Sequence, residues 1–186
     1  MKTTAATLLG ALGILAANAV SAADIAVPSM PGPVVVVVPV ETGFEWNRFF
    51  AGVQGGAWYE LDPGAFDSFR GATMVGRNIV LGDRFVVGAE AVGGFYFTAA
   101  EGIYFDTMGM ARAGILLGDR ALAYGTIGIG FDFAPLGGAF MVAGGGVEVG
   151  AGVNLGVRSE ILAFRYLGEP VSFISGTVGL SWYFGR

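Results

Sequence analysis

The sequence contains no histidine and no cysteine, and these two absences remove several classes of function. Histidine is the usual general base of hydrolytic enzymes because its side chain titrates near neutral pH. Without histidine and cysteine, a metal site is limited to carboxylate oxygens, and the acidic residues lack the spacing of a calcium-binding loop. The sequence therefore predicts no enzymatic activity, no cofactor and no metal site.

Charge is also scarce. Charged residues make up 13% of the chain, whereas a typical soluble domain carries about 25%. Asp and Glu outnumber Lys and Arg by 15 to 10, and Lys2 is the only lysine, which disfavours a nucleic-acid partner. No uninterrupted apolar run beyond the N-terminus is long enough for a membrane-spanning helix. Yet 54% of the residues are hydrophobic. This combination is typical of a transmembrane β-barrel, in which apolar residues occupy alternate positions.

The first 23 residues have the pattern of a secretory signal peptide. Lys2 supplies a short positive region, residues 5–17 form an apolar core, and residues 20–23 offer small side chains for cleavage. The sequence thus predicts export across the inner membrane, with residues 1–23 removed.

Residues 24–45 are expected to form a Pro-rich and Val-rich periplasmic lead-in. Its four prolines, Pro28, Pro31, Pro33 and Pro39, favour an extended tether around the run Val34–Val38. A segment inserted into the barrel lumen is the alternative interpretation. Residues 46–186 are then left for the barrel.

A four-residue repeat sets the spacing of this barrel region. Leu81–Arg84 has the same sequence as Leu117–Arg120, 36 positions later, and a β-type run follows each copy. Each copy is predicted to be a tight turn between antiparallel strands, so that one hairpin with its connections takes 36 residues. The span from Trp46 to Phe184 holds just under four such units, which predicts eight strands. The predicted periplasmic turn residues are Gly82, Asp83, Arg84, Gly118, Asp119 and Arg120.

Alternation of apolar and polar residues places the strands and their faces. On the third strand, Phe85 and Val87 share the apolar face, which should contact lipid, while Glu90 points to the lumen. We expect an all-β, eight-stranded, antiparallel up-and-down transmembrane β-barrel with short outer loops. The expected strands are residues 48–59, 69–80, 85–97, 105–116, 121–133, 140–150, 155–166 and 171–184.

Five inward charges lie three to six residues above the predicted periplasmic turns and should form one belt across the lumen. A buried charge persists only when it is paired or hydrated, and eight strands enclose a space that side chains can fill. We interpret the belt as a structural plug, with Gln54, Tyr124 and Thr126 close to it; a narrow ion path and a catalytic carboxylate pair remain alternatives. The belt consists of Glu90, Arg112, Glu148, Arg158 and Glu160.

Three further motifs carry a family resemblance. The segments Ala111–Gly114, Gly146–Glu148 and Gly179–Phe184, in this order and spacing, resemble the small outer-membrane β-barrel family of Gram-negative bacteria. Within this OmpA-like group, the sequence is most similar to alphaproteobacterial porin-like or opacity-type members, which also have a Pro-rich lead-in before a first strand that opens with Trp.

The resemblance implies a barrel in the outer membrane, in contact with lipid and lipopolysaccharide, that periplasmic chaperones and the barrel-assembly machinery deliver. It implies a role in envelope integrity and surface display, with Trp182 and Phe184 as the C-terminal assembly signal. Family members commonly end on the aromatic residue, whereas Gly185 and Arg186 follow it here. A second departure places Arg77 where an aromatic residue is common, facing lipid. Other functions that remain open are a narrow pore, a surface adhesin and a lipocalin-like carrier; the sequence does not predict an oligomeric state.

Overall fold

The computed structural model describes residues 43–61, 64–98, 102–135, 137–168 and 173–185. The predicted signal peptide and most of the lead-in, including Val34–Val38, lie outside the described residues. Within the described part of the chain, no helix is long and apolar enough to cross a membrane.

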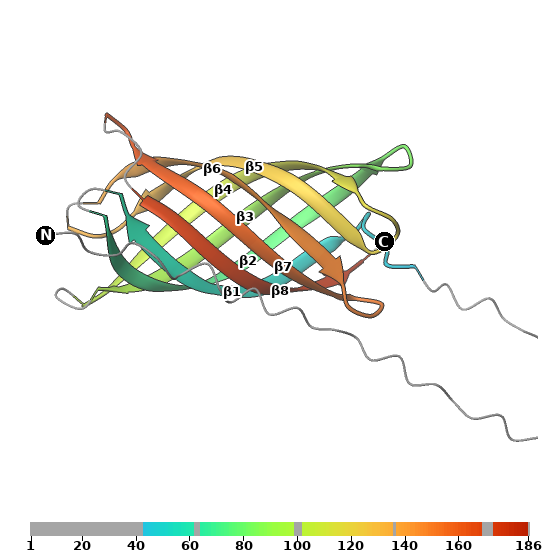
Figure 1. The fold of residues 1–186 in the computed structure, drawn as a ribbon, viewed down its shortest axis with the longest axis horizontal. Helices are drawn as coiled ribbons and strands as arrows, with labels where there is room; N and C mark the ends of the chain where they lie inside the picture. The colour runs from blue at the N-terminus through green and yellow to red at the C-terminus, as the bar shows by residue number, and fades with distance from the viewer. Residues whose placement is uncertain (1–42, 62–63, 99–101, 136, 169–172, 186) are drawn as a thin grey trace, which may run out of the picture. The chain divides into compact units, whose positions relative to one another are not determined.

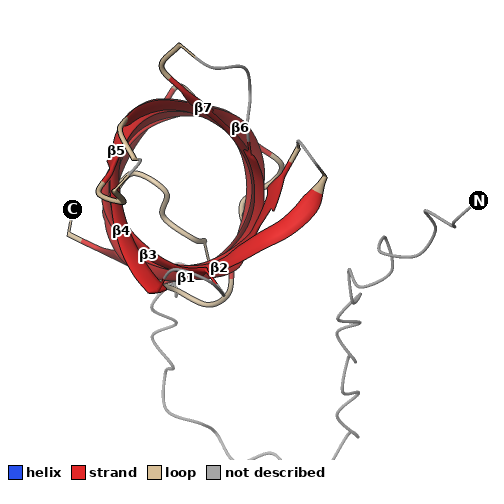
Figure 2. Ribbon diagram, turned by 90° about the vertical axis from the view of Figure 1, so that its left-hand side faces the viewer, coloured by secondary structure: helices blue, strands red, loops and turns tan. Residues whose placement is uncertain are grey.

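Eight antiparallel strands form a closed barrel, as the sequence predicts. Each strand pairs with its neighbour in the chain, and β1 pairs with β8 to close the ring (Figures 1 and 2). The strands are β1 (Phe49–Glu60), β2 (Ala65–Leu81), β3 (Phe85–Thr98), β4 (Gly102–Leu116), β5 (Ala121–Asp132), β6 (Ala139–Gly150), β7 (Leu155–Tyr166) and β8 (Phe173–Phe184).

The observed strand bounds differ from the predicted ones mainly at one end of the barrel. β2 begins at Ala65 rather than at residue 69, and β4 begins at Gly102 rather than at residue 105. A register shift between Trp58 and Tyr59 lets the β1–β2 hairpin continue to the pair Glu60 and Ala65. Such an irregularity interrupts the two-residue alternation, and periodicity alone therefore places the start of β2 too late.

Connections of two kinds define the two ends of the barrel. The turn end holds the β2–β3, β4–β5 and β6–β7 connections together with residues 43 and 185, at the right of Figure 1. At the loop end β1 is joined to β2, β3 to β4, β5 to β6 and β7 to β8. Gly82 and Gly118 have φ angles of 63° and 73° within the repeated turns. This left-handed conformation favours glycine, and it explains why both copies of the repeat carry one.

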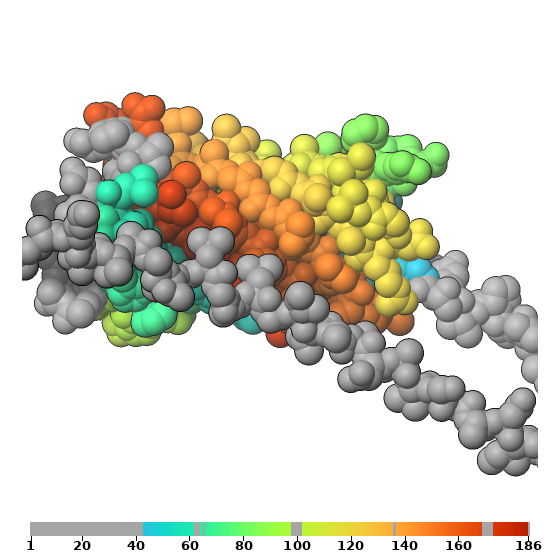
Figure 3. Space-filling view, in the orientation of Figure 1, coloured from blue at the N-terminus to red at the C-terminus, as the bar shows by residue number. Residues whose placement is uncertain are grey.

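The predicted faces of the strands are confirmed. Large apolar side chains point outward, with Phe85 exposed by 63% and Ile129 by 69%, while Glu90 and Arg112 are buried. The outward side chains of β5, β6 and β7 cover the wall in diagonal rows (Figure 3). An exterior that is apolar around an interior that holds charges is the inverse of a water-soluble protein and suits a hydrocarbon surrounding.

Two apolar clusters fill the lumen at different heights. The turn-end cluster consists of Phe44, Trp46, Phe50, Val86, Leu122, Tyr124 and Tyr183. The mid-barrel cluster consists of Trp58, Ala72, Met74, Val92, Met108, Met110, Phe140, Val142, Leu162 and Phe164. The predicted charge belt lies between these two clusters, so the lumen is a stack of apolar and polar layers.

Candidate functional site: a charge belt in the lumen

The structure brings all five predicted belt residues together. Arg158 on β7 makes a two-pronged ion pair with Glu90 on β3, with nitrogen to oxygen distances of 2.8 and 2.9 Å. The same guanidinium donates to Glu160 at 2.8 Å. Because β3 and β7 face each other across the ring, these contacts tie opposite walls of the barrel.

A second group of contacts runs around the ring through the even-numbered strands. Arg112 on β4 donates to Asn78 on β2 at 2.9 Å and to Glu148 on β6 at 3.2 Å. The Tyr183 hydroxyl on β8 donates to Glu148 at 2.9 Å and accepts from Asn78 at 3.3 Å. These four side chains therefore form a closed circuit through β2, β4, β6 and β8.

Further contacts join the two groups and the remaining strands. Arg112 lies 3.9 Å from Glu90, and the Tyr124 hydroxyl on β5 donates to Glu160 at 2.8 Å. On β1, the ring of Phe50 lies 4.5 Å from the Arg112 guanidinium carbon, a cation–π distance. Every strand of the barrel thus contributes a side chain to one connected belt.

Two residues expected near the belt do not join its hydrogen bonds. Thr126 donates instead to the backbone carbonyl of Ala111 at 3.1 Å. The side-chain amide of Gln54 is buried without a hydrogen-bond partner among the described residues. The sequence did not indicate that Asn78 and Tyr183 complete the belt, since neither carries a formal charge.

A second polar layer at the loop end was also missed. Arg70 and Asp106 form a two-pronged buried ion pair at 2.8 and 2.5 Å. Asp132 accepts from the hydroxyls of Tyr96 and Tyr166 at 2.9 and 2.6 Å. We call these five residues the loop-end network. Their spacing was a usable signal, because Arg70 and Asp106, like Tyr96 and Asp132, are 36 residues apart.

Inward glycines make room for the belt side chains. A Cβ atom at Gly156 would lie 2.5 Å from a carboxylate oxygen of Glu148. At Gly88 it would lie 2.8 Å from the Asn78 side-chain oxygen and 3.2 Å from Cγ of Arg112. Glycine at these positions lets a long charged side chain reach across the lumen.

The segment before β1 closes the turn end of the barrel. Phe44, from the predicted lead-in, and Trp46 are buried against Tyr183, with ring centroids 4.8 and 5.7 Å away. The Trp46 indole donates to the backbone oxygen of Asp119, in the β4–β5 turn, at 3.2 Å. Arg48 pairs with Glu45 beside them. The belt is therefore covered on this side by aromatic rings.

The predicted turn residues, the C-terminal aromatic residues and Arg77 lie at the predicted places in the fold. Gly82, Asp83 and Arg84, like Gly118, Asp119 and Arg120, form the β2–β3 and β4–β5 turns, whose periplasmic location stays a prediction. Trp182 and Phe184 point outward on β8, and their role as an assembly signal also stays a prediction. Arg77 is outward-facing, with its guanidinium 4.6 Å from the ring of Phe49.

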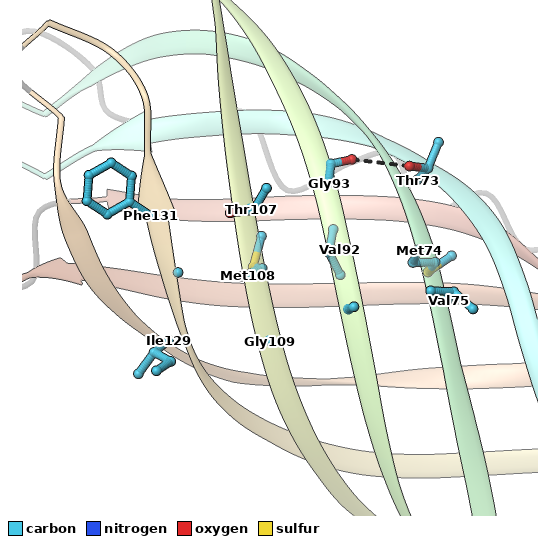
Figure 4. A pocket seen from close by; sticks show the side chains of 12 residues that line it. Thr73, Met74, Val75, Val92, Gly93, Thr107, Met108, Gly109, Ile129 and Phe131 are labelled. Carbon is cyan, nitrogen blue, oxygen red and sulfur yellow. Dashed lines mark hydrogen bonds between the residues drawn. The ribbon is translucent and has the colours of Figure 1, made fainter.

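The outer wall of β2 to β5 carries a shallow apolar groove. Its floor includes Gly93 and Gly109, while Ile129 and Phe131 stand at one side (Figure 4). The Thr73 hydroxyl donates to the carbonyl of Gly93 at 3.4 Å. The groove thus offers mainly hydrocarbon contacts, and the hydroxyl of Thr73, one of its two threonines, is internally bonded.

Guanidinium, carboxylate, amide and phenol groups of the belt are bonded to one another between two apolar clusters, although Nε of Arg158 and one carboxylate oxygen of Glu160 have no partner among the described residues. Among the described residues, no group of three or more acidic side chains is placed to hold a metal ion.

Comparisons with known proteins agree with this architecture. No protein-family model matches the sequence, and no curated protein sequence matches it. The solved structure of Ail, the attachment invasion locus protein of Yersinia pestis, matches with a TM-score of 0.56 at 13% identity, covering 74% of this chain and 97% of Ail. The N-terminal β-barrel domain of Pseudomonas aeruginosa OprF matches with a TM-score of 0.50 at 12% identity, covering 73% of this chain and 97% of that domain. The chain therefore has the fold of the small eight-stranded outer-membrane β-barrels.

Proposed function

We propose that this protein is an integral outer-membrane β-barrel that contributes to envelope integrity, displays short loops at the cell surface and has a closed lumen. The observation that carries the proposal is the belt, in which all five predicted charges are buried, connected and enclosed by apolar clusters. Its role is bracing, and neither catalysis nor a cofactor forms part of it.

The layered lumen argues against passage of ions or solutes. An ion that leaves water for an apolar layer loses hydration worth several kcal/mol or more unless charged partners replace it. Here the charged groups already bond one another. The aromatic and Met-rich layers on either side of them offer an ion no charged partner that could replace its lost water. The narrow-pore alternative would need these layers to separate.

The proposed surroundings follow from the exterior. Outer-membrane lipid and lipopolysaccharide would cover the apolar wall, while chaperones and the barrel-assembly machinery would handle the chain before insertion. We place the turn end in the periplasm, because barrels of this type have short periplasmic turns.

The binding-module alternative has less support. Ail is named for attachment and invasion, but the likeness to it concerns the fold. The four loop-end connections of this chain are short, and recognition usually requires longer loops on the rigid scaffold. A lipocalin-like carrier would need the opposite orientation of side chains, with the apolar face inward.

Planar-bilayer recording of the refolded protein tests the closed lumen. We expect no steady current from the wild type. A steady open current that Arg112→Ala abolishes would overturn the plug and favour the pore. Arg77→Ala, which changes an outward arginine, is the matched control and should leave the recording unchanged.

Deletion of the gene tests the envelope role. We expect the mutant cells to become more sensitive to detergents and bile salts, and complementation with the wild-type chain to restore resistance. Unchanged resistance, together with loss of adhesion to host or neighbouring cells, would favour the binding module instead.

A further inference from the structure

The unpartnered polar atoms of the lumen all lie on one wall. Among the described residues, seven buried side-chain nitrogen or oxygen atoms lack a hydrogen-bond partner. They belong to Gln54 and Trp58 on β1, to Arg158 and Glu160 on β7, and to Ser175 and Ser181 on β8. β8 pairs with both β1 and β7, so these atoms line a single strip of the interior.

The mid-barrel cluster is incomplete along this strip. Six strands contribute a buried side chain to the cluster, and β8 adds only the partly buried Phe173 at its loop end. Below Phe173, the inward residues of β8 are Ser175 and Thr177. β5 also contributes no side chain, but a Cβ at its Gly128 would lie 2.6 Å from Cγ of Met110, so the neighbouring side chain fills that position.

Strand pairing places the polar atoms in sequence along β8. Ser175 lies between Trp58 and Leu162, and Thr177 lies between Gly56 and Glu160. Gln54 lies opposite Gly179, which is the next inward position of β8 towards the turn end. The ring of Trp58 in turn stacks on Tyr96 of the loop-end network, with a centroid distance of 5.1 Å. The strip therefore runs from the charge belt to the loop-end network through the apolar layer.

Water is the ligand that fits these groups. The strip offers an indole donor at Trp58, a carboxylate acceptor at Glu160 and an amide with both functions at Gln54. Their hydroxyl-bearing neighbours on β8 both donate and accept. Buried polar groups without a protein partner are generally satisfied by internal water. We propose that the inner face of β8 binds a short file of water molecules that joins the charge belt to the loop-end network.

Such a file would hydrate the unpartnered carboxylate oxygen of Glu160 and the Nε of Arg158. Solutes and ions would remain excluded by the side chains around the file. The opposite wall, where Met108 and Met110 face the lumen, stays dry.

Nuclear magnetic resonance of the labelled mature chain in lipid nanodiscs tests the proposal by magnetisation transfer from water. We expect transfer to the Trp58 indole N–H and the Gln54 amide, and none to the methyl groups of Met108 and Met110. Absence of transfer at Trp58 and Gln54 would overturn the proposal. Equal transfer at the two methionines would overturn it as well, since the whole lumen would then be wet.

A variant pair locates the file on β8. Ser175→Val replaces a hydroxyl on the strip, and we expect transfer at Trp58 to fall several-fold. Thr126→Val replaces a hydroxyl on the opposite wall that is bonded to Ala111, and transfer at Trp58 should not change. Unchanged transfer at Trp58 in Ser175→Val would show that the inner face of β8 does not bind the water, and it would overturn the proposal. If Ser175→Val does not assemble, the wild-type protein still tests the proposal, because transfer at Trp58 and Gln54 can be compared with transfer at Met108 and Met110.

Discussion

Arg158 joins two carboxylates of the belt, because among the described residues it alone contacts both Glu90 and Glu160 through ion pairs at 2.8 Å. Arg158→Ala would leave these carboxylates buried with their main partner removed. We expect the free energy of unfolding to fall by about 3–5 kcal/mol, the usual cost of breaking a buried ion pair by removing one partner. Urea titration of the refolded protein, followed by its electrophoretic mobility shift, measures this loss.

Arg77→Ala is the matched control for that substitution. Arg77 lies on the outer wall over Phe49, so its removal loses a cation–π contact worth about 0.5–1 kcal/mol at an exposed site. Equal losses for Arg77→Ala and Arg158→Ala would contradict the bracing role of the belt.

The inward glycines make a second prediction at the same scale. Gly156→Ala brings a methyl group to 2.5 Å from the Glu148 carboxylate, and we expect a loss of about 1–3 kcal/mol from overpacking. Gly109→Ala, on the outer wall, meets no atom within 4 Å and should be close to neutral. The same urea titration compares the two variants, and similar stabilities would show that the lumen has spare room at Gly156.

At the scale of elements, β8 has two faces with separate tasks. Its inner face contributes Tyr183 to the belt, while its outer face carries Trp182 and Phe184. We expect Trp182→Ala combined with Phe184→Ala to reduce the amount of barrel inserted in the outer membrane several-fold, because the proposed assembly signal is removed. Quantitative blotting of outer-membrane fractions measures the change.

Val178→Ala serves as the control for the assembly prediction, since Val178 is also an exposed outward residue of β8. Normal insertion of the Trp182 and Phe184 double variant would show that the terminal aromatic residues are not required. Comparable losses for all these variants would point to general weakening of β8 instead.

The sequence predicted all eight strands because each exposes one face to hydrocarbon and the other to a filled lumen, which enforces alternation. Glu90, Arg112, Glu148, Arg158 and Glu160 were predicted as one belt because charges on the inner face are few. Asn78 and Tyr183 were missed since uncharged residues do not stand out in the pattern. Arg70 and Asp106 were missed, although both lie within predicted strands, because inward charges were sought only three to six residues above the predicted periplasmic turns.

At the scale of the whole molecule, four layers of side chains occupy the lumen. The turn-end cluster, the charge belt, the mid-barrel cluster and the loop-end network lie in succession along the barrel. We expect that loss of one layer would weaken the fold without producing a channel.

Substitution of both Phe44 and Trp46 by alanine tests this redundancy. These rings pack under the belt, and removal of a large buried aromatic side chain costs about 3–5 kcal/mol at a well-packed site. We expect lower stability in urea but no steady current in planar bilayers, because the mid-barrel cluster remains. A current from this double variant would show that the turn-end cluster is the main barrier.

The repeat first visible in the two Leu-Gly-Asp-Arg turns has a further consequence. Arg70 and Asp106, Arg112 and Glu148, and Tyr124 and Glu160 are all pairs separated by 36 residues. Each pair therefore joins two strands that run in the same direction and skips the strand between them. Duplication of one complete hairpin would preserve these partnerships in phase, whereas gain of a single strand would reverse the direction of every strand that follows. The hairpin is thus the unit by which a barrel of this design can be enlarged, in evolution or by engineering.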